Sequence, residues 1–174
     1  MSISTIVTMV CIVVLIYSLV LPDDGFSKKV SGFVTKHIFL LGFLITFGAM
    51  VSSLVYSNFI GYAPCLLCWY GRIAFYPQAL IYGIALKKRD NGALNYSLGL
   101  TIFGLLISGY HYVVESFQYS PLPCSAGGVS CLTRYVYMYG FITIPFMELV
   151  FFLAIFFAVL VAKRGLKSSV LQTA

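Results

Sequence analysis

Four of the five cysteines in this chain occur as two pairs, and their spacing suits disulfide chemistry. Cys65 and Cys68 form a C-x-x-C motif, and Cys124 and Cys131 follow with six residues between them. One cysteine pair can pass a disulfide to another by thiolate attack, through a mixed disulfide. The two pairs therefore predict a thiol-disulfide exchange centre. The fifth cysteine, Cys11, lies in an apolar run and is expected to be a small buried hydrophobic residue.

The first pair has features that favour redox chemistry over a structural disulfide. Cys65 and Cys68 are expected at the start of a helix, where the helix dipole stabilises a thiolate. Arg72 follows at a spacing that places its guanidinium on the same helical face. An arginine there could lower the pKa of a thiol, bind the polar head of a ligand, or simply anchor the helix at the membrane surface.

The second pair lies in a segment whose proline and glycine residues favour a mobile loop. These residues are Pro121, Pro123, Gly127 and Gly128. Four cysteines could instead hold a structural zinc ion, but the six residues between Cys124 and Cys131 exceed the usual two to four of zinc sites. Redox-active pairs are therefore the preferred interpretation, and no metal is expected.

Apolar residues dominate the chain, with 60% hydrophobic and 9% charged residues. An average soluble domain is about half apolar and about a quarter charged, so lipid is the expected solvent. Five runs approach the roughly 20 residues of a transmembrane helix: about 3–21, 38–57, 69–86, 94–113 and 139–162. We therefore expect an all-α fold in one domain over residues 1–174, a polytopic membrane four-helix bundle plus one extra N-terminal helix.

The basic residues indicate how these helices are oriented. They gather in three alternate segments: Lys28, Lys29 and Lys36; Lys87, Lys88 and Arg89; Lys163, Arg164 and Lys167. Basic loops stay on the cytoplasmic side, so the C-terminus is expected in the cytoplasm and both cysteine segments outside it, where disulfides persist. This distribution explains the formal charge of +6 better than a nucleic-acid surface does. The first run lacks the features of a cleaved signal peptide and is expected to be retained.

The chain resembles the DsbB disulfide bond formation proteins, and most closely their shorter BdbC-like branch. The stretch from Pro64 to Arg72 resembles the family motif P-C-x-x-C-x-x-x-R, and His111 with its flanking tyrosines resembles the histidine that precedes the second cysteine loop. The short pair Cys124 and Cys131 and the segment 140–146 resemble the BdbC-like branch. The resemblance covers about residues 38–162.

This resemblance implies a bacterial cytoplasmic-membrane enzyme that oxidises a secreted, DsbA-like protein of thioredoxin fold and reduces ubiquinone or menaquinone. By position, Cys124 would form the mixed disulfide with the partner, Cys65 would exchange with the loop pair, and Cys68 would engage the quinone. Arg72 and His111 would serve the quinone. A lipid-soluble acceptor also suits the chemistry, because cysteines alone cannot dispose of two electrons continuously and no dinucleotide-binding motif is present.

Two residues leave alternatives open, and the chain departs from the family pattern in two places. His111 could carry a proton for the quinone, or it could belong to an interfacial aromatic belt. Glu148 lies about nine residues inside the last expected helix and receives no role. Gly71 stands where the family often has Gln or Glu, and the first helix precedes the usual four.

Two other classes of protein remain as alternatives. A quinone-linked oxidoreductase of the vitamin K epoxide reductase type also uses membrane cysteine pairs, but its C-x-x-C usually follows the loop cysteines. A transport or scaffold protein could carry two purely structural disulfides, which should resist a mild thiol reductant.

Overall fold

A computed structural model describes residues 2–120, 125–126 and 129–173, and helices make up most of them. The α-helices are α1 (Ser2–Val20), α2 (Gly25–Leu54), α3 (Leu66–Lys88), α4 (Ala93–Phe117) and α5 (Ile144–Thr173). A short π-helix, Val55–Phe59, extends α2, and two short antiparallel strands, β1 (Ser125–Ala126) and β2 (Val129–Ser130), form a hairpin in the segment between α4 and α5. The expected all-α class is confirmed.

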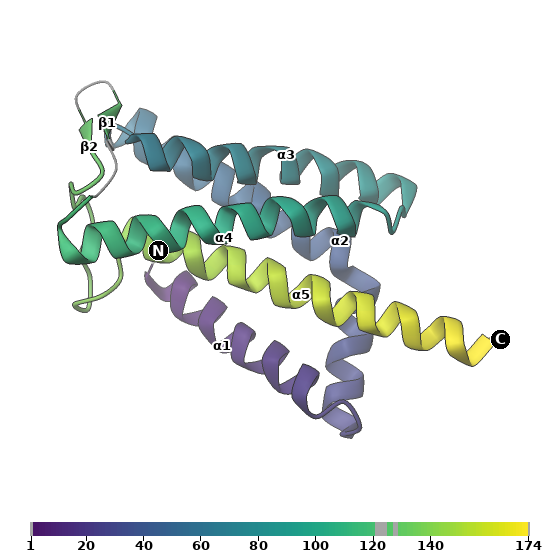
Figure 1. Cartoon of the computed structure of the whole chain (residues 1–174). Helices are drawn as coiled ribbons and strands as arrows, with labels where there is room; N and C mark the ends of the chain where they lie inside the picture. Colours follow the sequence, from purple (N-terminus) through teal and green to yellow (C-terminus); the bar gives the residue numbers. More distant parts are fainter. Residues whose placement is uncertain (1, 121–124, 127–128, 174) are drawn as a thin grey trace.

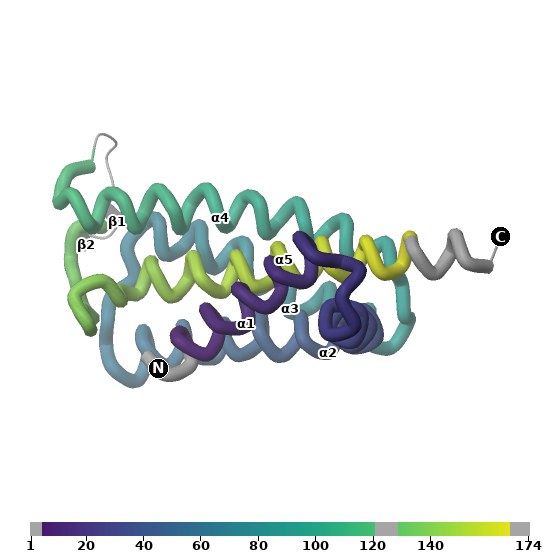
Figure 2. Tube along the Cα trace, turned by 90° about the horizontal axis from the view of Figure 1, so that it is seen from below, coloured from purple at the N-terminus to yellow at the C-terminus, as the bar shows by residue number. Residues whose placement is uncertain are grey.

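Four helices form a closed ring, and the first helix packs outside it. Contacts join α2 to α3, α3 to α4, α4 to α5 and α5 back to α2, whereas α1 lies against α5 and α2 (Figures 1 and 2). The expected four-helix bundle with one additional N-terminal helix is therefore the observed arrangement. Cys11, however, is exposed on α1 rather than buried, because only one side of this peripheral helix meets the bundle.

Small residues allow the helices to approach closely, which is the usual way helices associate in lipid. Gly42 of α2 faces the ring of Tyr82 in α3, and Gly104 of α4 faces the ring of Phe152 in α5. Phe152 is fully buried and stacks on Phe75 of α3 with 4.0 Å between ring centroids. The Phe75–Phe152 pair thus connects α3 with α5, and Gly104 brings α4 against the same ring.

Two helices have bounds that differ by several residues from the expected membrane spans. α2 begins at Gly25 rather than near residue 38, so Lys28, Lys29 and Lys36 lie in a helix and not in a loop. Lysine is a good helix former, and a helix can continue beyond the apolar stretch that hydropathy detects. α5 begins at Ile144 rather than 139 and continues to Thr173. Tyr139 and Gly140 have positive φ angles just before it, which interrupts the helix.

By length and apolar composition, three helical segments of the described chain can cross a membrane: Gly25–Phe59, Ala93–Phe117 and Ile144–Lys167. Thr5–Val20 is a shorter apolar helix. The chain is thus a multi-pass membrane protein, and the crossing of the membrane by α1 and α3 remains a prediction.

The three basic segments lie at one end of the bundle. The first turns of α2, the end of α3 with Arg89 and the C-terminal part of α5 share that end, and the β-hairpin lies at the other (Figure 1). Two hydrogen bonds at the basic end join α5 to other helices. Lys163 donates to Asn95 Oδ1 of α4 at 2.7 Å, and Arg164 donates to the Leu19 carbonyl of α1 at 2.7 Å. The cysteines of α3 are at the end away from these charges.

Candidate active site: two cysteine pairs and two cavities

Cys65 and Cys68 meet at the N-terminus of α3. Cys65 is the N-cap residue, with extended backbone angles, and its Sγ accepts a hydrogen bond from the Cys68 backbone N–H at 3.4 Å. The two Sγ atoms are 3.0 Å apart and both thiols are free. Pro64 directly precedes the N-cap residue, and as a proline it has no backbone N–H to donate. The motif therefore places two thiols at the positive end of a helix dipole.

His111 of α4 faces Cys65 directly. Its Nε2 lies 3.6 Å from Cys65 Sγ, and both side chains are 4% exposed, so bulk water does not screen their interaction. The other ring nitrogen, Nδ1, is buried and has no hydrogen-bond partner in the described part of the chain. The imidazole can therefore stabilise a Cys65 thiolate or accept its proton.

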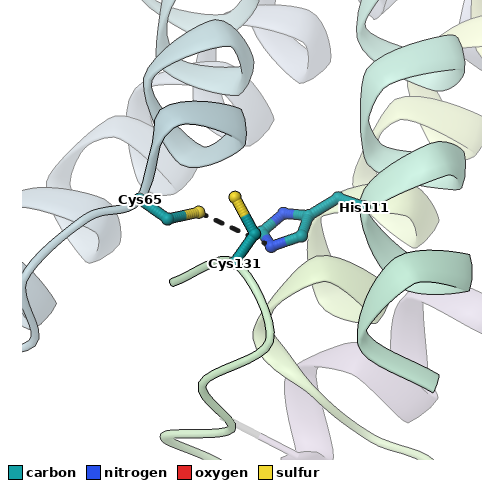
Figure 3. Close-up of side chains that lie close together, drawn as sticks. All are labelled: Cys65, His111 and Cys131. Carbon is teal, nitrogen blue, oxygen red and sulfur yellow. Dashed lines mark hydrogen bonds between the residues drawn. The ribbon is translucent and has the colours of Figure 1, made fainter. Parts of the chain in front are cut away.

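Cys131 completes a three-residue cluster with Cys65 and His111. The ligand atoms of these three side chains all lie within 4.8 Å of one another, and Figure 3 shows them converging from the N-cap of α3, from α4 and from the loop. Cys131 is 2% exposed and is disulfide-bonded. Cys124, the other predicted loop cysteine, lies outside the described residues.

The loop that carries Cys131 is tied to the helices on both sides of the cluster. Arg134 donates to the backbone carbonyl of Glu115 at 2.7 Å, and Gln118 donates to that of Leu132 at 3.2 Å. Tyr135 donates to the Ala63 carbonyl at 3.3 Å. These hydrogen bonds attach the loop to the end of α4 and to the segment before α3, so Cys131 is held beside Cys65.

The surroundings of Cys65 favour its thiolate. The hydrogen bond from the Cys68 thiol lowers the pKa of Cys65 most strongly, and the interaction with His111 lowers it further. Burial acts in the opposite direction but does not cancel these effects. Since the thiolate is the reactive form in disulfide exchange, Cys65 is the activated member of its pair.

Two cavities of different size meet at Cys68. The smaller, the Cys65 cavity, has a volume of about 30 Å³ and is lined by Cys65, Cys68, His111, Glu115 and Cys131, among others. The larger, the Arg72 cavity, has a volume of about 120 Å³. Its lining includes the polar residues Ser53, Tyr56, Cys68, Arg72, Tyr76 and Glu148 and apolar residues such as Phe75 and Phe151. Since the smaller cavity has room for little more than water, an organic ligand would have to use the Arg72 cavity.

Arg72 is oriented by its neighbours in the wall of this cavity. Its Nε donates to Ser53 Oγ at 3.0 Å, and its Nη2 donates to the Ser53 carbonyl at 3.3 Å. The guanidinium also lies over the ring of Trp69, 5.0 Å from its centroid, in a cation–π contact. These contacts leave other guanidinium N–H groups to bind a ligand.

Comparison with known proteins identifies the family of this chain. A sequence model described as disulfide bond formation protein DsbB matches residues 35–162. The chain belongs to the DsbB family. A probable disulfide formation protein of Oceanobacillus iheyensis is 45% identical over 124 residues, which cover 70% of this chain and 85% of that protein. The SPbeta prophage-derived disulfide bond formation protein B of Bacillus subtilis is 40% identical over 121 residues, covering 70% of this chain and 82% of the relative.

Other comparisons agree with this membership. A probable disulfide formation protein C of Halalkalibacterium halodurans is 37% identical over 139 residues, 79% of this chain and 98% of the relative. No solved structure matches the chain. The family match supports a disulfide-forming membrane protein over the vitamin K epoxide reductase and scaffold alternatives. It begins within α2, so α1 is an addition to the matched DsbB region.

Arg72 and His111, which were both expected to serve the quinone, line different cavities. Arg72 lines the larger cavity and His111 the smaller one, and Cys68 lines both. That His111 binds a quinone or carries a proton for it therefore stays a prediction, whereas the structure shows its contact with Cys65. The expectation that no metal is bound also stays a prediction. The side chains of Cys65, His111 and Cys131 are close enough to bind one metal ion, but the Cys131 sulfur is part of a disulfide.

Two carboxylates belong to the site although neither was predicted there. Glu115 is 3% exposed and lines the Cys65 cavity, and its Oε2 has no hydrogen-bond partner among the described residues. It follows His111 by four residues, and this helical spacing was a signal in the sequence. Glu148 of α5 lines the Arg72 cavity. No spacing relates Glu148 to α3, so only the packing of α5 on the ring could reveal its position.

Proposed function

We propose that this DsbB-family protein oxidises a secreted dithiol protein of thioredoxin fold, through Cys124 and Cys131 and then Cys65 and Cys68, and passes the electrons to ubiquinone or menaquinone. The observation that carries the proposal is the position of Cys65. Its sulfur lies 3.0 Å from that of Cys68 and within 4.8 Å of that of Cys131. A disulfide can pass between the pairs only through such a central sulfur.

The proposed relay balances without another redox group. A thiolate of the partner attacks Cys124, and Cys131 leaves as a thiolate. Cys131 then attacks Cys65, which breaks the Cys65–Cys68 disulfide. The second thiol of the partner releases Cys124, and Cys124 attacks Cys131 to free Cys65. The partner is oxidised, and Cys65 and Cys68 are left as thiols, which are the oxidation states described for Cys65, Cys68 and Cys131.

The side chains near Cys65 have defined parts in this relay. His111 stabilises the Cys65 thiolate when Cys65 is the leaving group, because its Nε2 is 3.6 Å from that sulfur. Burial of Cys65, Cys131 and His111 excludes water and competing thiols from the exchange. Arg134 and Gln118 hold the loop so that Cys131 stays in reach.

The Arg72 cavity fits a quinone head group. It is mainly apolar, and it lies beside Cys68. Arg72 offers N–H donors to a carbonyl oxygen, and the Tyr76 hydroxyl is buried without a hydrogen-bond partner in the described chain, as expected for a donor awaiting a ligand. A bound quinone would supply the two-electron acceptor that the cysteines lack. The role of Cys68 follows from its place in the cavity wall.

The orientation and the partner are part of the same proposal. We place the basic end of the bundle in the cytoplasm, following the usual bias of basic loops, and both cysteine pairs outside it in the bacterial envelope. Residues 1–174 would then form a single membrane domain. A secreted dithiol protein could reach Cys124 in the loop, whereas a lipid-soluble acceptor could reach Cys68 from the bundle.

Trapping of the partner tests the order of electron flow. In Cys131→Ala, the resolving thiol is missing, and we expect a reduced thioredoxin-fold partner to accumulate on Cys124 as a mixed disulfide, visible on non-reducing gels. In Cys68→Ala, we expect Cys65 to link to the loop while reduction of added short-chain ubiquinone or menaquinone is lost. Wild-type protein with the same partner should reduce the quinone.

Full oxidation of the partner by Cys124→Ala and Cys131→Ala variants would contradict the relay, since Cys65 and Cys68 would then act alone. Cys11→Ala is the matched control, because Cys11 lies on α1 outside the ring and is a free thiol. It should behave as wild type in both assays.

A further inference from the structure

Glu148 is a carboxylate in the wall of the Arg72 cavity that nothing in the relay uses. It lies one turn into α5, and it shares the cavity with Cys68 and Arg72 from α3. No hydrogen bond and no ion pair within the described chain engages its carboxylate, even though Arg72 lines the same cavity. An acidic group inside a membrane bundle is costly unless it has a function.

Gly71 makes the position of Glu148 possible. Oε1 of Glu148 occupies the space that a Cβ atom would take at residue 71, so any other residue there would displace the carboxyl group. Gly71 is buried in α3 and directly precedes Arg72. Glycine inside a helix is unfavourable relative to alanine. The close approach of Glu148 gives a physical reason for a glycine at position 71. The carboxyl group is thereby fitted against the helix that carries Cys68.

The chemistry of the proposed acceptor gives a carboxyl group at this place a use as a proton carrier. Oxidation of the Cys65 and Cys68 thiols to a disulfide releases two electrons and two protons, and conversion of a quinone to a hydroquinone consumes both. Other titratable or charged groups line the two cavities: Cys68, Arg72 and Tyr76 from α3, His111 and Glu115 from α4, Tyr56 from the helix before α3, and Cys65, Tyr62, Cys131 and Tyr135 from the loops. Within the Arg72 cavity, Glu148 is the only carboxyl group among the described lining residues.

We propose that Glu148 delivers a proton to the quinone oxygen during reduction, and that Gly71 is the positioning residue that admits this carboxyl group. Glu148 loses one proton to the acceptor and regains one released by the Cys68 thiol, so the carboxyl group returns to its starting state. The proposal rests on quinone reduction in the Arg72 cavity, and it adds to that function a residue from a different helix.

Two substitutions test the proposal from both sides of the contact. Glu148→Gln keeps the size of the side chain and removes the transferable proton, and we expect quinone reduction by the prereduced protein to slow roughly 100-fold, as for the loss of a general acid. Gly71→Ala should displace the carboxyl group and slow the same step. Because both changes abolish the same proton transfer from Glu148, the double variant should be no slower than the slower single variant.

Binding is measured separately from reduction with the protein's single tryptophan. Trp69 lies beside Arg72, so added short-chain quinone should quench its fluorescence to the same extent in wild type and Glu148→Gln. Glu148→Asp should recover part of the rate, because it restores a proton. Gly83→Ala is the matched control on α3: a Cβ there makes only ordinary contact with Phe43, 3.4 Å away, and the rate should not change.

Each outcome has a distinct meaning. If wild-type protein neither binds nor reduces quinone, the proposed function itself fails. If wild type reduces quinone and Glu148→Gln does so at the same rate with the same pH profile, Glu148 is no proton donor and this inference is overturned. A large loss in Gly71→Ala with a normal Glu148→Gln would also overturn it, since Gly71 would then serve helix packing alone.

Discussion

At the scale of single residues, the proposed relay depends on one activated sulfur placed between two others. Cys65 combines the end of a helix dipole, a hydrogen bond from the Cys68 thiol and a contact with His111, and each of these favours negative charge on its sulfur. Cys65 lies between the other two sulfurs: that of Cys68, which lines the Arg72 cavity, and that of Cys131 in the loop. Reactivity at the site should therefore depend on His111 as well as on the cysteines.

We predict that reduced Cys65 stays reactive at lower pH than an ordinary thiol, whose pKa is about 8.5. The lowered pKa keeps Cys65 as a thiolate below that value, so its alkylation by iodoacetamide should decline only at more acidic pH. His111→Ala removes one cause of the lowering, and the decline should move to higher pH. Mass spectrometry of the alkylated Cys65 peptide measures the profile.

The control for this measurement is His37→Ala. His37 is a partly exposed residue of α2 in a tilted ring contact with Phe33, far in sequence from the cysteines, and its loss should leave the Cys65 profile unchanged. An unshifted profile in His111→Ala would show that the imidazole has no influence on the Cys65 thiolate.

At the scale of elements, close helix contacts hold the two cavities in place. α5 supplies Glu148 and packs on α4 through Gly104 and Phe152, and Phe152 stacks on Phe75, which lines the Arg72 cavity. A side chain added at this crossing has no free space, because the interior is close-packed. The cavity geometry thus depends on a contact one helix away from it.

We predict that Gly104→Ala destabilises the bundle by about 1–3 kcal/mol, the usual cost of overpacking a core. The new Cβ would overlap the Phe152 ring, which is fully buried. Unfolding in detergent, followed by circular dichroism, measures the change. Gly99→Ala on the same helix meets nothing within 4 Å and should be neutral or slightly stabilising. Equal stability of the two variants would contradict the packing.

At the scale of the whole molecule, the bundle separates charge from redox chemistry. Its basic segments share one end, and the hairpin and the Cys131 loop share the other (Figure 1). This separation lets the sulfurs face an oxidising compartment while the basic end faces the cytoplasm, which is the orientation we propose. α1 adds an outer helix against α5 and α2 without lining either cavity.

Labelling of single cysteines tests this orientation. With the native cysteines replaced, Asn58→Cys at the hairpin end should react with a membrane-impermeant maleimide in intact cells. Asn91→Cys at the basic end should react only after permeabilisation. Both asparagines are exposed, so accessibility to the reagent depends on the side of the membrane. Labelling of Asn91→Cys in intact cells would reverse the proposed topology.

The sequence by itself determined the class of the protein, because long apolar runs and a C-x-x-C motif are local features of the chain. Helix existence, the pairing of Arg72 with the start of α3 and the family resemblance all follow from spacing within one segment. Helix boundaries were not determined by the sequence, since hydropathy marks where lipid can lie rather than where a helix ends, as α2 and α5 show. The contact of Cys65 with His111 and Cys131, the separation of His111 from the Arg72 cavity, and the fit of Glu148 against Gly71 were decided only by tertiary structure. Each of them joins helices or loops far apart in sequence, and packing of the ring, not local spacing, sets which side chains meet.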